Sequence, residues 1–368
     1  MRFVPARSAA LAASALALVA LAAPAAHGRP PAHGGLPTTT LVRADVPPVI
    51  DGVLDDPAWA TAVKFEDWKT YKPDMDKDPT QRTVAYLTYD ADNLYFAVRA
   101  FDTEPDKVKA AVSKRDGIDT DDIVGLILDT FNDQQSGFTF MLNAQGIQED
   151  GMINVQGNLD TGFDMVWYSK GRIDDKGWTV EARVPLKSLR FPNKKNLTMR
   201  AVFLRFTIRT SENATSPPIN PYSGSILGQC RPVELSGLHY KRVIEILPAA
   251  TYRHVQDAED GRMVTTDKTK LTDVPSLTAK VGVTSDLVFD GALNPDFSQV
   301  EADAGQVDVN LRYANYYQEK RPFFLEGQDL WQFAAMMEDS PLQALVYTRT
   351  IISPDYGFRL TGKIGRKD

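Results

Sequence analysis

The chain has 368 residues and a formal net charge of −7, which becomes −9 once Arg2 and Arg7 are removed with the N-terminal segment discussed next. An acidic chain without a basic stripe is a poor binder of nucleic acid, so we expect no nucleic-acid partner. Cys230 is the single cysteine, which excludes an internal disulfide. After residue 40 only His239 and His254 remain, and no motif around them supports a zinc site or a Ser-His-Asp triad.

Residues 1–26 have the pattern of a secretory signal peptide. Arg2 and Arg7 form a basic start, the apolar run Ala9–Ala23 is too short to span a bilayer, and small residues follow as a cleavage site. That length also disfavours the alternative, an N-terminal membrane anchor. Residues 27–40 are rich in Pro and Gly and predict a linker. We therefore expect an exported protein of the periplasm or the cell outer membrane.

The first folded segment begins with an expected edge strand at Leu41–Val53. Pro47 and Pro48 limit it to an edge, because proline cannot donate to a strand ladder. Asp56 and Pro57 predict the start of a short helix, which turns Trp59 toward the core.

The centre of the chain predicts a buried hairpin. Ile123–Leu128 is apolar on both sides, as in a central strand covered on both faces. Turn residues then lead to Phe138–Asn143, which puts Phe138, Phe140 and Leu142 on one face. The same reasoning predicts strand pairs at Thr83–Tyr89 with Asn93–Phe101 and within 162–184. It also predicts a strand at Met199–Arg209, with Val202 and Leu204 inward. Short helices are expected at Glu104–Ala111 and after Pro185, and a long loop at Ser211–Cys230.

Frequent strands with short helices at their edges predict a β-sandwich over residues 41–237. The pattern changes near Leu238, where longer segments alternate apolar and polar residues. This alternation is typical of an outer-membrane barrel, and also of a second soluble sheet with one face on a core. On either interpretation the fold class is all-β, with a β-sandwich as the first part of the chain. The alternating segments are Ile244–Tyr252, Leu277–Phe289, Val307–Tyr313 and Tyr356–Ile364.

Four stretches resemble carbohydrate-binding module family 9. They are Val49–Trp59, Tyr89–Phe96, Asp122–Asp129 and Gly177–Pro185, and their order and spacing fit over residues 41–237. The resemblance implies a non-catalytic sandwich that binds a polysaccharide or an oligosaccharide.

Three later stretches resemble an uncharacterised domain that follows family 9-like modules in large exported proteins. They are Asn294–Asp303, Glu319–Gly327 and Tyr347–Arg349. That domain is similar to an outer-membrane β-barrel, so outer-membrane lipid is the expected partner of residues 238–368. Its members continue well past Asp368, so the resemblance implies an all-β chain in which the sandwich is followed by the first antiparallel strands of an incomplete β-barrel.

Family 9 modules that bind sugar clamp it between two tryptophans, and both are missing from the matching places. Asp116–Asp121 contains no tryptophan, and Asn220–Gly224 offers only Tyr222. Stacking on a sugar needs an exposed flat ring. The candidate ligand-binding residues are therefore Trp167, Tyr168 and Tyr222.

The resemblance also implies structural calcium, for which Asp119, Asp121 and Asp129 are the candidate ligands because calcium prefers carboxylate oxygen. The alternative is that these carboxylates cap turns. We assign no catalytic residue, because a glycosidase needs two carboxylates facing each other across a cleft and the sequence does not pair any. Three functions stay open: a saccharide-binding module, a structural cap or plug of the barrel, and a polysaccharide hydrolase in carbohydrate catabolism.

Overall fold

The structure is a computed structural model. It describes residues 36–157, 159–160, 165–238, 244–249, 252–259, 262–269, 276–284, 287–295, 322–325, 348, 351 and 354–362. The expected signal peptide, most of the linker, the strand at 307–313 and most of the three later family stretches lie outside these residues.

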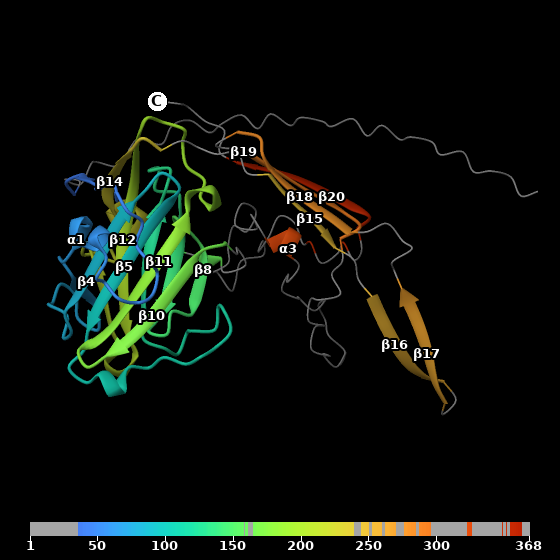
Figure 1. The fold of residues 1–368 in the computed structure, drawn as a ribbon, viewed down its shortest axis with the longest axis horizontal. Coiled ribbons are helices and arrows are strands. Elements are labelled where there is room, and N and C mark those ends of the chain that lie inside the picture. The colour runs from blue at the N-terminus through green and yellow to red at the C-terminus, as the bar shows by residue number, and fades with distance from the viewer. Residues whose placement is uncertain are drawn as a thin grey trace, which may run out of the picture. The chain divides into compact units, whose positions relative to one another are not determined.

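Residues 36–238 form two β-sheets, with only short helices (Figure 1). The smaller sheet is antiparallel and has the order β10-β11-β5-β4-β2. Its strands are β2 (Val63–Phe65), β4 (Thr83–Tyr89), β5 (Asn93–Phe101), β10 (Tyr168–Asp174) and β11 (Gly177–Pro185).

The larger sheet has nine strands in the order β1-β14-β12-β6-β7-β8-β9, with β13 pairing β12 and β3. Only β1 and β14 pair in parallel within it. Its strands are β1 (Thr39–Thr40), β3 (Lys69–Lys72), β6 (Ile123–Asp129), β7 (Ser136–Asn143), β8 (Gln148–Asn154), β9 (Leu159–Asp160), β12 (Asn196–Thr207), β13 (Glu212–Ser216) and β14 (Arg231–Ser236). The helices are α1 (Pro57–Thr61) and α2 (Ile226–Gln229), with 3-10 turns at Pro105–Lys107, Leu186–Ser188 and Ile208–Thr210.

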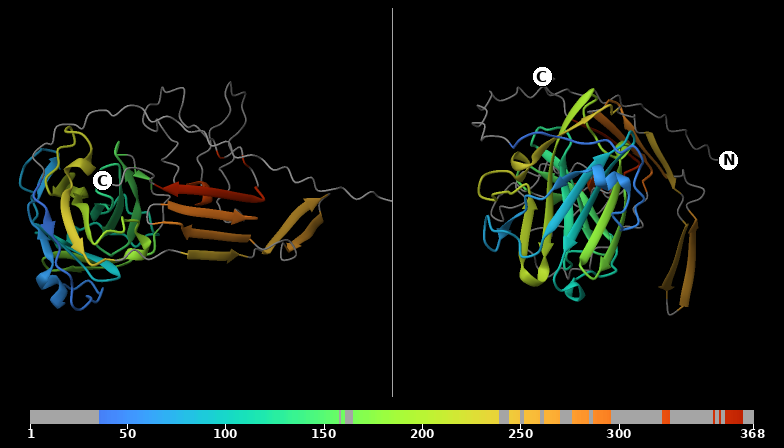
Figure 2. Two further views of the ribbon diagram at one scale, coloured as in Figure 1. Left: turned by 90° about the horizontal axis from the view of Figure 1, so that it is seen from above. Right: turned by 60° about the vertical axis from the view of Figure 1, so that its left-hand side comes forward.

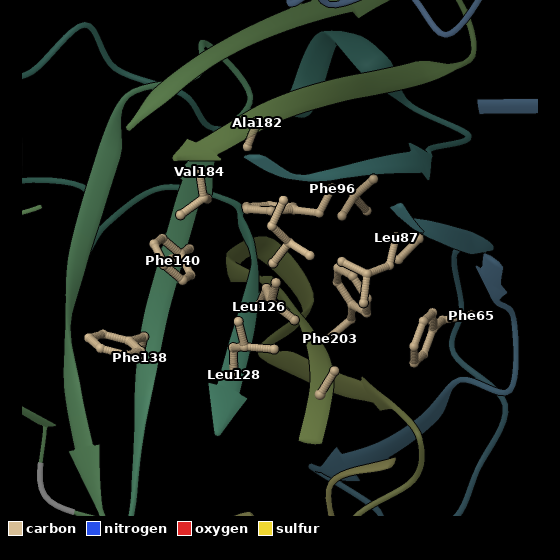
Figure 3. Close-up of a cluster of buried hydrophobic side chains, with 14 of the residues drawn as sticks. Phe65, Leu87, Phe96, Leu126, Leu128, Phe138, Phe140, Ala182, Val184 and Phe203 are labelled. Carbon is tan, nitrogen blue, oxygen red and sulfur yellow. The ribbon is translucent and has the colours of Figure 1, made fainter. Parts of the chain in front are cut away.

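The two sheets enclose one apolar interior, which we call the inner core. Figure 3 shows side chains from both sheets pointing toward one another within it. Phe96 of β5 packs 6.2 Å, ring centre to ring centre, from both Phe140 of β7 and Phe203 of β12. The period-two alternation of these strands explains the arrangement, because every second side chain points inward. The all-β prediction is confirmed.

The predicted central strand is buried on both faces, as expected for β6. Val124, Leu126 and Leu128 face the inner core, whereas Ile123 and Ile127 face a second apolar cluster on the other side of the sheet. Helix α2 closes that second cluster with a fully buried leucine, Leu227.

Four sequence predictions differ from the structure. Leu41–Val53 forms no strand: the short strand β1 ends at Thr40, in the predicted linker, and a single bridge from Arg43 to Tyr89 follows. Only a 3-10 turn forms within Glu104–Ala111. The face of β12 is reversed, since Phe203 faces the inner core and Val202 the second cluster. The expected loop Ser211–Cys230 contains β13 and α2.

Within residues 244–362, the part that the structure describes contains a four-stranded antiparallel sheet in the order β15-β18-β19-β20, a two-stranded pair and the short helix α3 (Pro322–Leu325). The strands are β15 (Ile244–Ala249), β18 (Ser276–Gly282), β19 (Leu287–Leu293) and β20 (Tyr356–Gly362), with β16 (Tyr252–Glu259) and β17 (Arg262–Thr269) as the pair (Figure 2). The predicted segments Ile244–Tyr252 and Tyr356–Ile364 lie mostly in β15 and β20. The segment Leu277–Phe289 is not a single strand, because a turn divides it between β18 and β19.

The register of this four-stranded sheet gathers apolar residues on one side, which we call the apolar face. The opposite side carries an ion pair of 3.0 Å between Asp290 and Arg359. No helix in the described part of the chain has the length and apolar character needed to cross a membrane. The apolar face consists of Ile244, Ile246, Pro248, Leu277, Ala279, Val281, Phe289, Gly291, Leu293, Tyr356, Phe358 and Leu360.

Candidate ligand-binding site

The inner face of the five-stranded sheet packs in the inner core, and its outer face carries polar side chains. Tyr168 on β10 pairs with Arg183 on β11, which pairs with Tyr95 on β5. Directly paired residues share a face, and Ala182 and Val184 on either side of Arg183 point into the inner core. Tyr168, Arg183 and Tyr95 therefore face away from the core in one row.

The middle of this outer face is covered by the chain around α1. The carboxylate of Glu181 accepts hydrogen bonds from the Asp51 and Gly52 amides at 2.9 and 2.6 Å and from the Trp59 indole at 2.6 Å. Burial raises the pKa of Glu181 to about 7, although these three donors act to lower it. Trp59 is buried as predicted, but it packs on the outer face against Tyr95 rather than in the inner core. The segment around α1 is thus bound to β11 through Glu181 and packs against Tyr95 at one end of the row.

A cavity of about 370 Å³ opens next to the row, at the end of the sheet where β4 turns into β5. Tyr168 and Arg183 line it from the strands, Asp92 and Asn93 from the β4–β5 turn, and Lys187 from the 3-10 turn after β11. Its size falls within the usual range of small-ligand sites. Its apolar lining consists of Ala91, Val166, Pro185, Leu186 and Phe191.

The β4–β5 turn is held in place by one carboxylate. Asp90 accepts hydrogen bonds from the Asp92 and Asn93 amides and from the Tyr95 hydroxyl, each at 2.7 Å. Burial, together with the Asp90 carboxylate, raises the pKa of Tyr95, so this hydroxyl stays a donor. The wall formed by Asp92 and Asn93 is thus preorganised.

Arg183 is the unusual cation of the cavity. Its guanidinium lies over the Tyr168 ring, 4.3 Å from the ring centre. It makes no hydrogen bond or ion pair with any residue that the structure describes, and its Nε is shielded from solvent without a partner. On the same sheet, Arg99 binds both oxygens of Asp174 at 2.8 Å. The Arg183 guanidinium is therefore oriented by stacking and keeps its Nη hydrogen-bonding capacity.

The three predicted aromatic residues lie in different surroundings. Trp167 is 4% exposed and packs in the inner core, 5.2 Å from Phe140, so it cannot stack on a ligand. Tyr168 is 48% exposed and lines the cavity. Tyr222 is 86% exposed but lies in the loop between β13 and α2, away from the cavity lining. Only Tyr168 is placed for ligand contact in this cavity.

The sequence reasoning missed Arg183, Asn93 and Lys187 as site residues. A signal for Arg183 was present, because Trp178–Val184 alternates cleanly and places Arg183 on the outer face. Asn93 and Lys187 lie in turns, and no local pattern indicates that these turns share a cavity.

The three predicted calcium ligands do not form one site. Asp119 is exposed, whereas the buried Asp121 accepts a hydrogen bond from the Asn143 amide at 2.8 Å. Asp129 accepts from three backbone amides of the turn 131–134, which is the turn-capping alternative. Asp121 precedes β6 and Asp129 ends it, and the six residue steps of β6 alone span about 20 Å at 3.3 Å per residue. Within the described residues no group of three or more metal-binding side chains occurs, so calcium binding stays a prediction.

Two family models match the chain. Residues 50–214 match the family described as "Carbohydrate family 9 binding domain-like", and residues 257–337 match "Domain of unknown function (DUF5916)". The first match supports the family 9-like assignment of the sandwich and covers less than half of the chain. No curated protein matches the sequence significantly.

Solved structures of low similarity were also found. A family 9 carbohydrate-binding module from Caldicellulosiruptor kristjanssonii in complex with cellotriose is 16% identical, with a TM-score of 0.40, over 56% of this chain and 95% of that one. Its glucose complex gives 16%, 0.39, 56% and 97%. A protein from Bacteroides uniformis, proposed to bind carbohydrate, gives 11%, 0.42, 54% and 96%. TM-scores below 0.5 do not establish a shared fold, so the sandwich assignment comes from the sheets of this chain.

Proposed function

We propose that residues 41–237 form a non-catalytic module that binds a saccharide in the cavity beside Tyr168. The observation that supports this most is a half-exposed aromatic ring in a preorganised polar cavity, within the segment that matches the family 9 binding-domain model. A tyrosine ring offers a flat apolar surface to the C–H groups of a sugar ring, while Lys187 offers hydrogen-bond donors to its hydroxyls.

Calorimetry with the purified full chain tests this proposal. The panel holds cello- and xylo-oligosaccharides together with oligosaccharides of other neutral and acidic sugars. We expect saturable binding to at least one of them. If none binds, the chain is not a saccharide-binding module.

We further propose that the four-stranded sheet is the start of an outer-membrane β-barrel, which makes the protein an exported one of the outer membrane. The apolar face supports this, because five of its members are more than half exposed while the other face pairs Asp290 with Arg359. Alternating lipid-facing and lumen-facing residues are the pattern of such barrels. These five members are Ile244, Ile246, Tyr356, Phe358 and Leu360.

A second candidate function is a structural cap or plug of the barrel that binds no sugar. The burial of Trp167 favours it, because the cavity then offers one exposed aromatic ring where sugar-binding family 9 modules use two. Calorimetry and cell fractionation together separate the two candidates. If the protein is recovered with the outer membrane and binds no saccharide of the panel, the structural role is supported.

A polysaccharide hydrolase is the third candidate. It needs two carboxylates across a cleft, and among the described residues that line the cavity Asp92 is the single acid. Release of reducing ends from polysaccharide by the purified protein would establish hydrolysis in spite of this.

A further inference from the structure

The cavity beside Tyr168 has a cation without a counter-ion at its wall. Arg99, on strand β5 of the same sheet, binds both oxygens of Asp174 at 2.8 Å, and Arg209 in the 3-10 turn after β12 binds both oxygens of Asp102 at 2.7 and 2.9 Å. Arg183 has no such partner among the described residues and is held by its stacking on Tyr168. A guanidinium held in this way presents planar donors that match a carboxylate.

The charges around the cavity point the same way. Arg183 and Lys187 are two cations on the lining, and Asp92 is the single described acid on it. Lys187 is exposed, so its ammonium can approach a ligand without losing an existing ion pair. The lining therefore carries a net positive charge in a protein whose overall charge is negative.

We infer that this cavity takes a saccharide that bears a carboxylate, with the sugar ring near Tyr168 and the carboxylate on the Nη edge of Arg183. The inference rests on the proposed saccharide-binding function and specifies its ligand class. A stacked arginine and a neighbouring tyrosine would recognise the charged and the apolar parts of one uronic acid unit together. The volume of about 370 Å³ leaves room for such a unit.

The test compares each acidic ligand with its own neutral form. Di- and trisaccharides of galacturonic and glucuronic acid, their methyl esters and the parent neutral sugars are titrated calorimetrically into the full chain. We expect the free acid to bind roughly ten- to a hundredfold more tightly than its ester, as charge-assisted hydrogen bonds provide. The preference should weaken with added salt, because the cavity is open to solvent.

Substitutions test whether Arg183 causes the preference for the free acid over its ester. Arg183→Gln should bring the ratio of acid affinity to ester affinity close to one, and Arg183→Lys should retain part of the preference for the acid. Arg172→Gln is the matched control, since Arg172 is an exposed arginine on the same face of β10 that does not line the cavity. Unchanged melting temperatures verify that each variant is folded.

The outcomes separate this inference from the proposed function. Equal affinity for acid and ester, or a preference that survives in Arg183→Gln, overturns the acidic ligand and leaves saccharide binding standing. Absence of binding to every saccharide overturns both.

Discussion

Tyr168 and Trp167 are neighbours in sequence, but the Tyr168 ring is half exposed whereas the Trp167 ring is buried. Only the Tyr168 ring can therefore contact a ligand. Tyr168→Ala removes the exposed ring from the cavity, so we expect saccharide affinity to fall roughly tenfold or more. Calorimetry measures this loss, and Tyr168→Phe should keep most of the affinity because it keeps the ring.

Tyr222→Ala is the matched control for that change. Tyr222 is the more exposed tyrosine, and its ring lies outside the cavity lining. Its replacement should leave affinity unchanged. A loss at Tyr222 with none at Tyr168 would place the ligand on the β13–α2 loop instead.

Glu181 gives a prediction about pH. Its pKa in the folded chain is raised from 4.5 to about 7. Between these two pH values the folded state keeps the proton on Glu181, whereas the unfolded state has released it. The stabilisation from this group is complete below about pH 4.5 and is lost as the pH rises through 7. Denaturant unfolding between pH 5 and 8 should show the wild type losing stability relative to Glu181→Gln as pH rises. Parallel curves would contradict the assignment.

Sequence alone reached part of the site at this scale. It named Tyr168 as one of three candidate aromatic residues, without choosing between them. Which of the two adjacent rings, Trp167 or Tyr168, points inward depends on the pairing of β10 with β11. That pairing puts Tyr168 opposite Arg183 and is a contact between distant residues. For the same reason the acids Asp119, Asp121 and Asp129 were grouped as ligands, although a strand separates two of them.

At the scale of elements, one buried arginine connects the two sheets. Arg205 of β12 is 3% exposed and donates to the Arg82 and Phe101 carbonyls at 3.1 and 2.9 Å and to the Thr83 hydroxyl at 2.8 Å. Burial lowers its pKa to about 10, so it stays charged at neutral pH. These bonds tie the nine-stranded sheet to β4 and β5 of the other.

Arg205→Lys keeps the charge but cannot reach all of these acceptors, so buried groups lose their partners. We expect a loss of about 2–4 kcal/mol in the free energy of unfolding, measured by denaturant titration. The exposed Arg172→Lys should change stability by no more than about 0.5 kcal/mol. Equal effects of the two changes would show that Arg205 does not join the sheets.

Strands with local signals were predictable, and strands made by distant pairing were not. β4 and β5 alternate and meet at a tight Asp-rich turn, so both were found with their bounds. β13 reads as loop because its Asn and Ser residues favour turns, yet it pairs with β12 and β3. Leu41–Val53 alternates enough to suggest a strand, but its prolines leave only isolated bonds to β14 and β4.

At the scale of the whole molecule, the apolar face predicts association with a membrane. Ile246 lies on this face and its neighbour Glu245 lies on the other. A lysine facing lipid costs about 2–4 kcal/mol near the bilayer centre. Ile246→Lys should therefore reduce the share of the protein that sediments with the outer membrane in cell fractionation, whereas Glu245→Lys should not. Recovery of the wild-type protein in the soluble periplasmic fraction would contradict the barrel proposal.

The central claim is that the sandwich binds a saccharide at the end of its five-stranded sheet. A crystal structure of the full chain with a bound oligosaccharide tests it most directly. We expect a sugar ring within about 4.5 Å of the Tyr168 ring, with a polar substituent on Arg183. A sugar bound at the β13–α2 loop, with the cavity beside Tyr168 left empty, would contradict the claim.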